Sequence, residues 1–472
     1  MGEIAVKSHQ DPRRPYTLLT GATGLLGQYL MRDLLLAGHR IAVLTRSYRR
    51  LEATDRIEQI MQRFESELDQ PLPRPVIVEG DIHQTDLGLS TADRQFVLQH
   101  CGQIIHSAAI LKFHGIQDPT VEPWRTNVEG TRHVLDTAAE LGIRRFHYIS
   151  TAYVCGCRTG LIQEDEFERG QDFRNDYERS KFAAERLVRE SESRFDAVTV
   201  YRPVVIAGDS HSGFTSTYHG LYLYLRLFAM FVPEQDRGPD GRILTPVRVP
   251  LDGDEPRNVV PVDWVAAAFC RLFEEPGAAG RTFHLAPEQR LTPRQVIEAC
   301  YQYFDSHGVR FCGRDTARGP EPDYAARIFD NIAIYQQYET SDPQFDTSNF
   351  RQFAGDVPCP PIDAAIIRRY LEFGERDQWG KSRPSIDPAV ATPEIVRQLE
   401  LIGQQRDARL PMPVRILGPG GGDWTVAGGR AGKPVTVSRG CQGPHRLAIV
   451  ELDRIRLLPT DSGVVAPADG RG

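Results

Sequence analysis

The sequence predicts an α/β protein built on a doubly wound, mostly parallel sheet, and three observations support this fold class. Six short apolar runs rich in β-branched residues lie in the first two hundred residues. Longer amphipathic stretches separate these runs, and strands that alternate with helices indicate βαβ units. A glycine-rich turn directly follows the first run and opens a helix, as is typical of a Rossmann-type architecture.

The predicted elements follow one another regularly along the chain. The apolar runs predict strands at 16–20, 40–45, 75–79, 103–106, 145–150 and 197–202. Helical patterns occupy 25–38, 127–142, 218–231, 262–275 and 291–304, with another around 393–406. Between 206 and 258 the regular pattern gives way to loops, apart from the aromatic stretch that begins at 218.

We expect three parts in this chain. An N-terminal tail, 1–14, precedes a large dinucleotide-binding domain at 15–380, whose substrate-binding elements lie within 206–258 and 283–380. The remaining residues, 381–472, are rich in glycine and proline. They predict a C-terminal extension or a small β-rich module, to which the sequence assigns no role.

The composition excludes several classes of protein. Of the 472 residues, 40% are hydrophobic and 25% charged, which indicates a globular protein. The net charge of −7 includes no long basic run, so we expect no nucleic-acid partner. We find no secretory signal and no apolar stretch of about 18 residues, and therefore expect a cytoplasmic protein without a transmembrane segment. No cysteine or histidine spacing predicts a metal site, and no feature predicts an oligomeric state.

The glycine-rich turn is the first candidate site. Gly21, Gly24 and Gly27 stand between the first strand and the first helix, where the chain must turn sharply and approach a pyrophosphate closely. The helix N-terminus supplies a matching positive potential. We therefore expect this turn to bind a dinucleotide, the alternative being a tight turn that holds no ligand. The other residues of the turn in this site are Thr23, Leu25 and Leu26.

The residues after the second strand predict the choice of dinucleotide. An NAD-preferring site usually presents an acidic side chain about 20 residues past the glycines. This chain has Thr45, Arg46 and Ser47 at that place. A guanidinium can meet the additional 2′-phosphate with charge-assisted hydrogen bonds, so the sequence predicts NADPH as the cofactor. The alternative is a solvated loop.

Further candidates stand at the ends of the third and fourth strands. Ligands of open α/β sheets lie at the carboxyl ends of the strands, and small residues there let a flat dinucleotide approach the backbone. Asp81, followed by Ile82, can hold the adenine amine, although an N-cap or turn residue is an alternative for Asp81. Ser107, Ala108 and Ala109 follow the fourth strand.

Tyr177 and Lys181 are the candidates for acid–base chemistry. They stand four residues apart in the segment QDFRNDYERSKFAAE, so a helix brings both to one face. An exposed pair on a solvated helix is the alternative. A phenol has a pKa near 10, and a neighbouring ammonium is expected to lower it by about 1–3 units. Tyr177 would then take part in general acid–base catalysis near neutral pH.

Three more side chains belong to this predicted site. Lys181 is expected to have a second task, hydrogen bonding to the nicotinamide ribose. Thr151, after the fifth strand, is expected to orient the oxygen of the substrate, with Ser150 as the alternative hydroxyl. The amide of Asn127 can steady the region, although an asparagine that opens a helix is as often a cap.

The ordered motifs resemble the extended short-chain dehydrogenase/reductase superfamily over about the first 380 residues. The more specific resemblance is to its male-sterility, fatty-acyl reductase and thioester-reductase branch. The resemblance implies that Thr151, Tyr177 and Lys181 are catalytic and that Arg46 binds NADPH, with Pro203 and Val205 beside the nicotinamide. The motifs are GATGLLG, GDIHQTDLGLS, IIHSAA, NVEGT, ISTAYVCG, FRNDYERSKFAAE, YRPVVIAG and NVVPVDWVAAA.

The preferred hypothesis is an NADPH-dependent reductase of an activated acyl group. Its substrate would be a thioester on coenzyme A or on a carrier protein, reduced to an aldehyde or an alcohol. The aromatic segment 218–231 would cover the acyl chain, or else be an ordinary core-facing helix. A ketone or aldehyde reductase, or a sugar or sterol dehydrogenase, would use the same three residues. A non-catalytic dinucleotide-binding protein is the hypothesis from another class.

Overall fold

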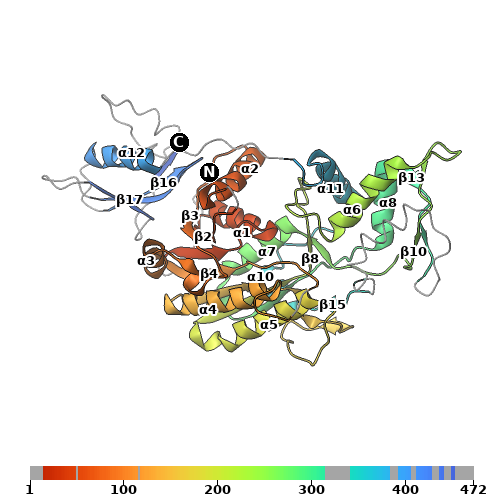
Figure 1. Ribbon diagram of the computed structural model, residues 1–472, viewed down its shortest axis with the longest axis horizontal. Coiled ribbons are helices and arrows are strands. Elements are labelled where there is room, and N and C mark those ends of the chain that lie inside the picture. The colour runs from red at the N-terminus through yellow and green to blue at the C-terminus, as the bar shows by residue number, and fades with distance from the viewer. Residues whose placement is uncertain are drawn as a thin grey trace.

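The computed structural model describes most of the chain and shows a central sheet with helices on both faces (Figure 1). The described residues are 14–48, 51–114, 117–313, 338, 341–382, 392–405, 411–427, 435–440 and 448–451. All but the last residue of the predicted N-terminal tail, 1–14, therefore falls outside the described part of the chain. Within that part, no helix is both long and apolar enough to cross a membrane.

Seven parallel strands form the central sheet, in the order β12-β7-β5-β4-β1-β2-β3. They are β1 (Tyr16–Thr20), β2 (Arg40–Thr45), β3 (Val76–Glu79), β4 (Cys101–His106), β5 (Arg145–Ile149), β7 (Ala197–Pro203) and β12 (Thr282–Leu285). The strand order reverses between β1 and β4, where Thr20 pairs with His106. In open α/β sheets the ligand binds at such a switch point.

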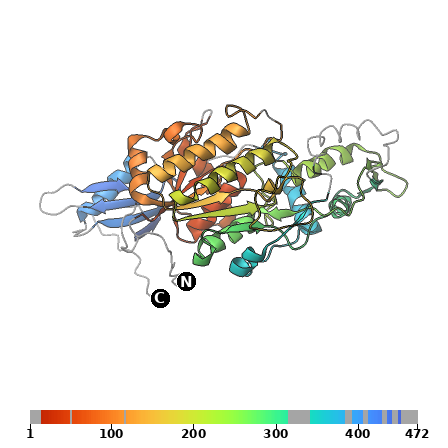
Figure 2. The same ribbon diagram turned by 90° about the horizontal axis from the view of Figure 1, so that it is seen from below.

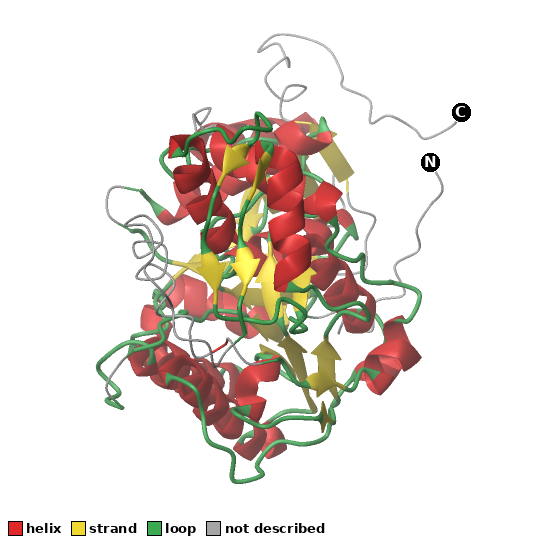
Figure 3. Ribbon diagram, turned by 90° about the vertical axis from the view of Figure 1, so that its right-hand side faces the viewer, coloured by secondary structure: helices red, strands yellow, loops and turns green. Residues whose placement is uncertain are grey.

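The helices cover the sheet in two layers, as Figure 3 shows. One layer contains α1 (Leu25–Leu36), α2 (Ala53–Leu68) and α7 (Val262–Phe273), and the other contains α3 (Thr91–His100), α4 (Gly130–Glu140) and α5 (Asp176–Glu190). Because both faces are covered, the central strands are buried nearly throughout, which explains their continuous apolar runs.

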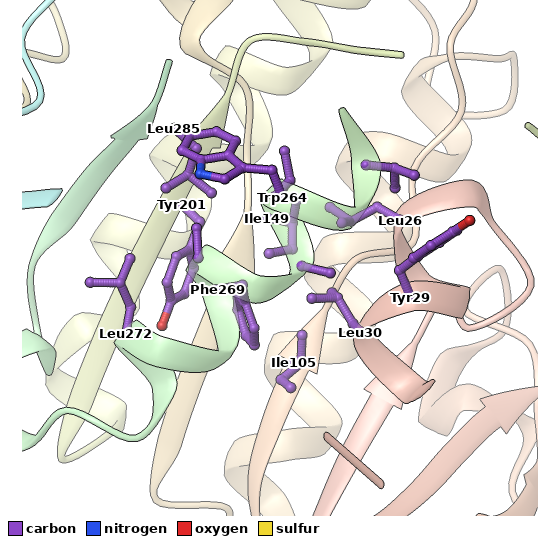
Figure 4. Packing of buried hydrophobic residues seen from close by; sticks show 14 of the residues in the cluster. Leu26, Tyr29, Leu30, Ile105, Ile149, Tyr201, Trp264, Phe269, Leu272 and Leu285 are labelled. Carbon is purple, nitrogen blue, oxygen red and sulfur yellow. The ribbon is translucent and has the colours of Figure 1, made fainter. Parts of the chain in front are cut away.

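The larger apolar core lies between α1, α7 and the sheet (Figure 4). Tyr29 and Leu30 of α1 and Phe269 of α7 are fully buried there. Their spacing along each helix brings apolar side chains to the face toward the strands. Burying one such side chain contributes roughly 1.5–3 kcal/mol, so this layer holds the ends of β1 and β4 in place.

A smaller subdomain packs beyond the carboxyl ends of the strands. Its three helices, α6 (Leu221–Phe231), α8 (Pro293–Phe304) and α11 (Ala364–Arg376), share an apolar core. Short parallel pairs surround them: β8 (Val205–Ala207) with β11 (Val259–Pro261), β9 (Ile243–Leu244) with β13 (Ser306–His307), and β10 (Arg248–Val249) with β14 (Arg310–Phe311). Another pair, β6 (Leu161–Ile162) with β15 (Gln344–Phe345), and the helix α10 (Ser348–Ala354) lie toward the sheet domain.

Short helical turns connect these elements. They are η1 (Thr85–Gly88), η2 (Arg125–Glu129, a π-helical turn), η3 (Ala152–Cys155), η4 (Glu192–Arg194), η5 (Val232–Glu234) and η6 (Pro276–Ala278).

The C-terminal residues form a separate sheet at the other end of the molecule (Figure 2). Its order is β18-β17-β16-β19, with the helix α12 packed on one face. The elements are α12 (Thr392–Gln405), β16 (Met412–Leu417), β17 (Gly422–Ala427), β18 (Thr436–Arg439) and β19 (Ala448–Glu451). The module meets the amino ends of β1 and β3, since Asp423 accepts a hydrogen bond from Tyr16 and Gly418 donates to Leu72.

The predicted fold class is confirmed, and all six predicted strands form within two residues of their predicted ends. The seventh strand, β12, was not predicted, and neither were α2 and α3. The predicted region of loops at 206–258 contains the short strands β9 and β10 in addition to α6.

Candidate active site

A cavity of about 550 Å³ opens between the sheet and the smaller subdomain. It begins at the glycine turn and the ends of β4, β5 and β7, and extends between α6 and α8. Apolar side chains make up most of its lining. The predicted site residues that line it are Gly21, Gly24, Leu25, Leu26, Gly27, Ser107, Ala109, Thr151, Tyr177, Lys181, Pro203 and Val205.

The glycine turn packs closely against neighbouring backbone and therefore requires glycine at two positions. Gly21 has a φ of +76°, and a Cβ at this position would lie 2.6 Å from the Ala108 nitrogen. A Cβ on Gly27 would lie 2.0 Å from the Gly21 oxygen, so only glycine fits there. The N-cap of α1, Gly24, supplies no side-chain hydrogen bond to the first turn of the helix. The free N–H groups of that turn therefore fit a pyrophosphate.

The other predicted cofactor residues lie outside the cavity. Thr23 lies in the turn itself, while Arg46, Asp81 and Ile82 follow β2 and β3 at the same edge of the sheet. Arg46 forms an ion pair with Asp81 at 2.6 Å, although we predicted separate roles for the two side chains. Burial raises the pKa of Asp81, but the hydrogen bond from the His83 backbone N–H and the pairing with Arg46 prevail, so the pKa is lowered.

Arg56 is a residue of this region that the sequence did not predict. Its guanidinium donates to the Arg46 carbonyl at 2.6 Å and to the Thr23 hydroxyl at 3.2 Å. It therefore lies between the glycine turn and the end of β2, although it stands in α2. Burial and the charge of Arg46 lower its pKa. No sequence motif marks Arg56, because its place depends on how α2 packs.

Thr151 stands at the junction of β5 and β7. It caps η3 by accepting from the Tyr153 amide at 3.3 Å, and it donates to the Pro203 carbonyl at 3.4 Å. Its hydroxyl also lies near the Tyr177 side chain, whose pKa it lowers. The neighbouring Ser150 instead donates to Glu185 at 2.6 Å. Of the two hydroxyls considered, Thr151 is therefore the one that faces Tyr177.

Tyr177 lies in the first turn of α5, which Asn175 caps by accepting from the Glu178 amide at 3.0 Å. The expectation that Lys181 lowers its pKa is wrong. Burial raises the pKa of Tyr177 to about 12, and the nearby Thr151 side chain offsets this only in part. The phenol is therefore protonated at neutral pH and can donate a hydrogen bond.

The position of Lys181 explains why the pKa of Tyr177 is not lowered as predicted. Its Nζ donates to the Tyr148 hydroxyl and to the Ile149 carbonyl, each at 2.9 Å, on the end of β5. Burial also lowers the pKa of Lys181 to about 7, against the attraction of Glu185. An amine that is only partly charged near neutral pH stabilises a phenolate less than a fully charged one.

Asn127 joins three parts of the site. Its amide nitrogen donates to the Ser180 hydroxyl at 2.9 Å and to the Ile110 carbonyl at 3.1 Å, and its oxygen accepts from the Ile110 amide at 2.9 Å. It does not cap a helix, since it lies within η2. Asn127 thus ties the loop after β4 to α5, which carries Tyr177.

One buried carboxyl was also missed by sequence reasoning. Asp342 lines the cavity. Its carboxyl accepts a hydrogen bond from the Tyr153 hydroxyl at 3.0 Å and another from the backbone N–H of Asn258 at 2.8 Å. Burial raises its pKa. Among the described side chains, no group of three histidines, cysteines or acids could hold a metal ion.

Comparison with known proteins gives relatives of several kinds. A linear gramicidin synthase chain of Brevibacillus parabrevis is 27% identical over 390 residues, which cover 76% of this chain and 7% of that protein. The aldehyde reductase lnaA of Aspergillus flavus is 23% identical over 393 residues, which cover 75% of this chain and 35% of that protein. The chain thus spans only a small part of the length of these curated relatives.

A solved structure and a family match agree with these relatives. The terminal R domain from the myxalamid PKS-NRPS biosynthetic pathway is 27% identical, with a TM-score of 0.62 over 79% of this chain and 94% of that domain. The family described as male sterility protein, an NAD-binding family, matches residues 19–269, more than half of the chain. The resemblance predicted from the motifs is confirmed. This chain belongs to the male sterility protein family.

Proposed function

We propose that this protein is an NADPH-dependent reductase of an acyl thioester, carried on coenzyme A or on a carrier protein, and that it forms an aldehyde or an alcohol. The observation that carries the proposal is that the side chains of Thr151 and Tyr177 line the same end of a largely apolar cavity. The glycine turn and Lys181 line the same cavity. A hydride donor, two hydroxyl donors and an apolar acyl chain can therefore meet in one space.

The two hydroxyls act on the carbonyl oxygen of the substrate. A bound nicotinamide dinucleotide supplies a hydride to the carbonyl carbon. As the carbon–oxygen π electrons move onto oxygen, Thr151 and Tyr177 donate hydrogen bonds to that oxygen, a contribution worth about 10²–10³ in rate for one donor. Collapse of the resulting tetrahedral species re-forms the carbonyl, breaks the carbon–sulfur bond and expels a thiolate. The thiolate takes up a proton from solvent, and the aldehyde is released. Reduction to the alcohol would need a second hydride from a second NADPH, and Tyr177 would give the resulting alkoxide its proton.

The cofactor choice rests on two guanidinium groups. Arg46 and Arg56 lie together at the end of β2, beside Thr23 of the glycine turn. An additional 2′-phosphate would find two cations there, and the free N–H groups of the α1 N-terminus would bind the pyrophosphate. Lys181 would hydrogen bond to the nicotinamide ribose.

The lining of the cavity supports an acyl substrate with a substantial apolar part. α6 contributes Leu221, Leu227 and Phe228, while α8 contributes Val296 and Ile297. Each buried methylene contributes about 0.8 kcal/mol to binding. The relatives named above include a gramicidin synthase chain and a terminal R domain, which supports a carrier-bound thioester as the substrate class.

The proposal can be tested by measuring the decrease in the absorbance of NADPH. The purified protein is mixed with NADPH and, separately, with acyl-CoAs, acyl-carrier thioesters, aldehydes and ketones. We expect consumption of NADPH with thioesters and release of the free thiol. Consumption with ketones alone would instead indicate a ketone reductase of the same superfamily. Tight binding of NADPH without turnover of any compound would indicate a dinucleotide-binding protein that is not an enzyme.

A further inference from the structure

The amine of Lys181 is held by two acceptors at the end of β5. Its Nζ donates to the hydroxyl of Tyr148 and to the Ile149 carbonyl at 2.9 Å each, and it lies 4.5 Å from the centroid of the Tyr148 ring. An ammonium has three hydrogens, so one is left after these two bonds. Lys181 also lines the cavity, where that hydrogen can meet a ligand.

The hydroxyl of Tyr148 accepts the hydrogen bond from Lys181 and lies near the side chain of Thr131. The Thr131 hydroxyl donates its single hydrogen to the Asn127 carbonyl at 2.6 Å. The lone pairs of the Tyr148 oxygen let it accept from Lys181 while its own hydrogen stays available for donation.

His106 and Thr20 complete the network. Nε2 of His106 lies 3.0 Å from the Thr131 hydroxyl, and Nδ1 lies 2.7 Å from the Thr20 hydroxyl. Thr131 has no hydrogen left, so Nε2 donates to it, and Nδ1 accepts from Thr20, whose oxygen accepts from the Ala108 amide at 3.3 Å. Burial lowers the pKa of His106 to about 3, which keeps the ring neutral, as these directions require.

The five side chains of the network are buried, and Lys181 alone among them lines the cavity. They are Thr20, His106, Thr131, Tyr148 and Lys181. A bond lost inside such a network is not replaced by water, and it therefore costs more than a bond lost at the surface.

We propose that Tyr148 is a positioning residue for Lys181. Together with the Ile149 carbonyl, its hydroxyl holds the amine at the end of β5, so that the remaining hydrogen of the amine is directed to the cavity. This inference rests on the proposed function only in the assumption that Lys181 acts on a ligand in that cavity. The titratable groups near the amine are Tyr148 on β5, His106 on β4, and Tyr177 and Glu185 on α5.

Labelling of the amine in the substitution Tyr148→Phe tests the inference. The chain has five lysines, at 7, 112, 181, 381 and 433, so peptide mapping reports each one separately. Acetylation by a small anhydride over a range of pH, without cofactor or substrate, measures the neutral amine of Lys181, with the exposed Lys112 as a reference in the same sample. In the unsubstituted protein, we expect half-maximal labelling of Lys181 near pH 7, as its lowered pKa of about 7 requires.

Tyr148→Phe removes a hydrogen bond that stabilises the charged amine, so the labelling midpoint should fall by about one pH unit. Dissociation constants for NADPH, measured by fluorescence titration, should rise several-fold. Tyr201→Phe is the matched control, because that buried hydroxyl on β7 is hydrogen-bonded to His147, at 3.1 Å, rather than to Lys181. The control should leave both values unchanged.

An unchanged midpoint in folded Tyr148→Phe protein would overturn the inference. If that protein fails to fold, Tyr148→Met decides, since it also removes the hydroxyl that accepts from Lys181 and should move the midpoint in the same direction. The labelling needs no reductase activity. A shifted midpoint in a protein that reduces no thioester would therefore leave the positioning role intact and refute the proposed function alone.

Discussion

Burial acts on both titratable groups of the Tyr177–Lys181 pair by favouring the neutral form. It raises the pKa of Tyr177 to about 12 and lowers that of Lys181 to about 7. At neutral pH the phenol is therefore protonated. A protonated phenol can donate a hydrogen bond to an oxyanion, whereas removing a proton from a substrate would need the phenolate.

Tyr177→Phe removes this donor and should lower kcat about 10²–10⁴-fold, with the dissociation constant of NADPH nearly unchanged. Steady-state kinetics and a binding titration check this, and a variant with unchanged kcat would remove Tyr177 from the chemistry.

Arg46 and Arg56 make a second prediction at the residue scale. A charge-assisted hydrogen bond contributes about 1.5–3 kcal/mol, so replacing either arginine by alanine should weaken NADPH binding about 10- to 100-fold. NADH lacks the 2′-phosphate and should be affected much less. Arg132→Ala is the control, because this arginine is exposed on α4 and pairs with Glu129. Equal losses for the two cofactors would count against a phosphate contact at Arg46 and Arg56.

At the scale of elements, α5 is fixed to the sheet by a buried carboxylate. Glu185 accepts from Arg202 at 2.6 Å and from Ser150 at 2.6 Å. Burial alone would raise the pKa of Glu185, but the Arg202 guanidinium prevails and lowers it to about 2. Because this value lies below the pKa of about 4.3 in the unfolded chain, the group stabilises the fold above pH 4.3, and this stability is lost as pH falls toward 2.

The substitution Glu185→Gln tests this anchor. It removes the negative charge opposite the buried Arg202 guanidinium, which costs about 3–5 kcal/mol at neutral pH. The difference in unfolding free energy between the two proteins should narrow as pH falls from 4.3 to 2, when the natural protein loses the same charge. Urea unfolding at several pH values measures it, with Glu372→Gln of an exposed pair on α11 as control. A difference that does not depend on pH would contradict this account.

The elements that could be predicted are those whose own residues carry the signal. β1, β2, β4 and β5 are buried on both faces and show continuous apolar runs. By contrast, β12 has only four residues at the sheet edge, and it forms through pairing with the distant β7. The site follows the same rule. Motif residues such as Thr151 could be predicted, whereas the contacts of Tyr148 and Arg56 form only in the folded chain.

At the scale of the whole molecule, the C-terminal module and the cavity lie at opposite ends of the strands. The module meets Tyr16, the first residue of β1, while the cavity begins after Thr20, the last. A buried cluster joins the two parts: Asp423 pairs with Arg415 at 2.8 Å and accepts from the Tyr16 hydroxyl at 2.8 Å. The face toward the sheet domain is therefore polar, although the face toward α12 is apolar.

This separation predicts that stability and cofactor binding respond differently to a change at Asp423. Asp423→Ala removes the buried ion pair with Arg415 and the hydrogen bond from the Tyr16 hydroxyl, so it should lower the unfolding free energy by about 3–5 kcal/mol. The dissociation constant of NADPH should stay within about twofold, because the central strands keep their carboxyl ends in place. Chemical unfolding and a binding titration measure the two effects, with Asp136→Ala of an exposed pair as control. Weakened NADPH binding in folded Asp423→Ala protein would mean that the module acts on the distant cofactor site through the strands between them.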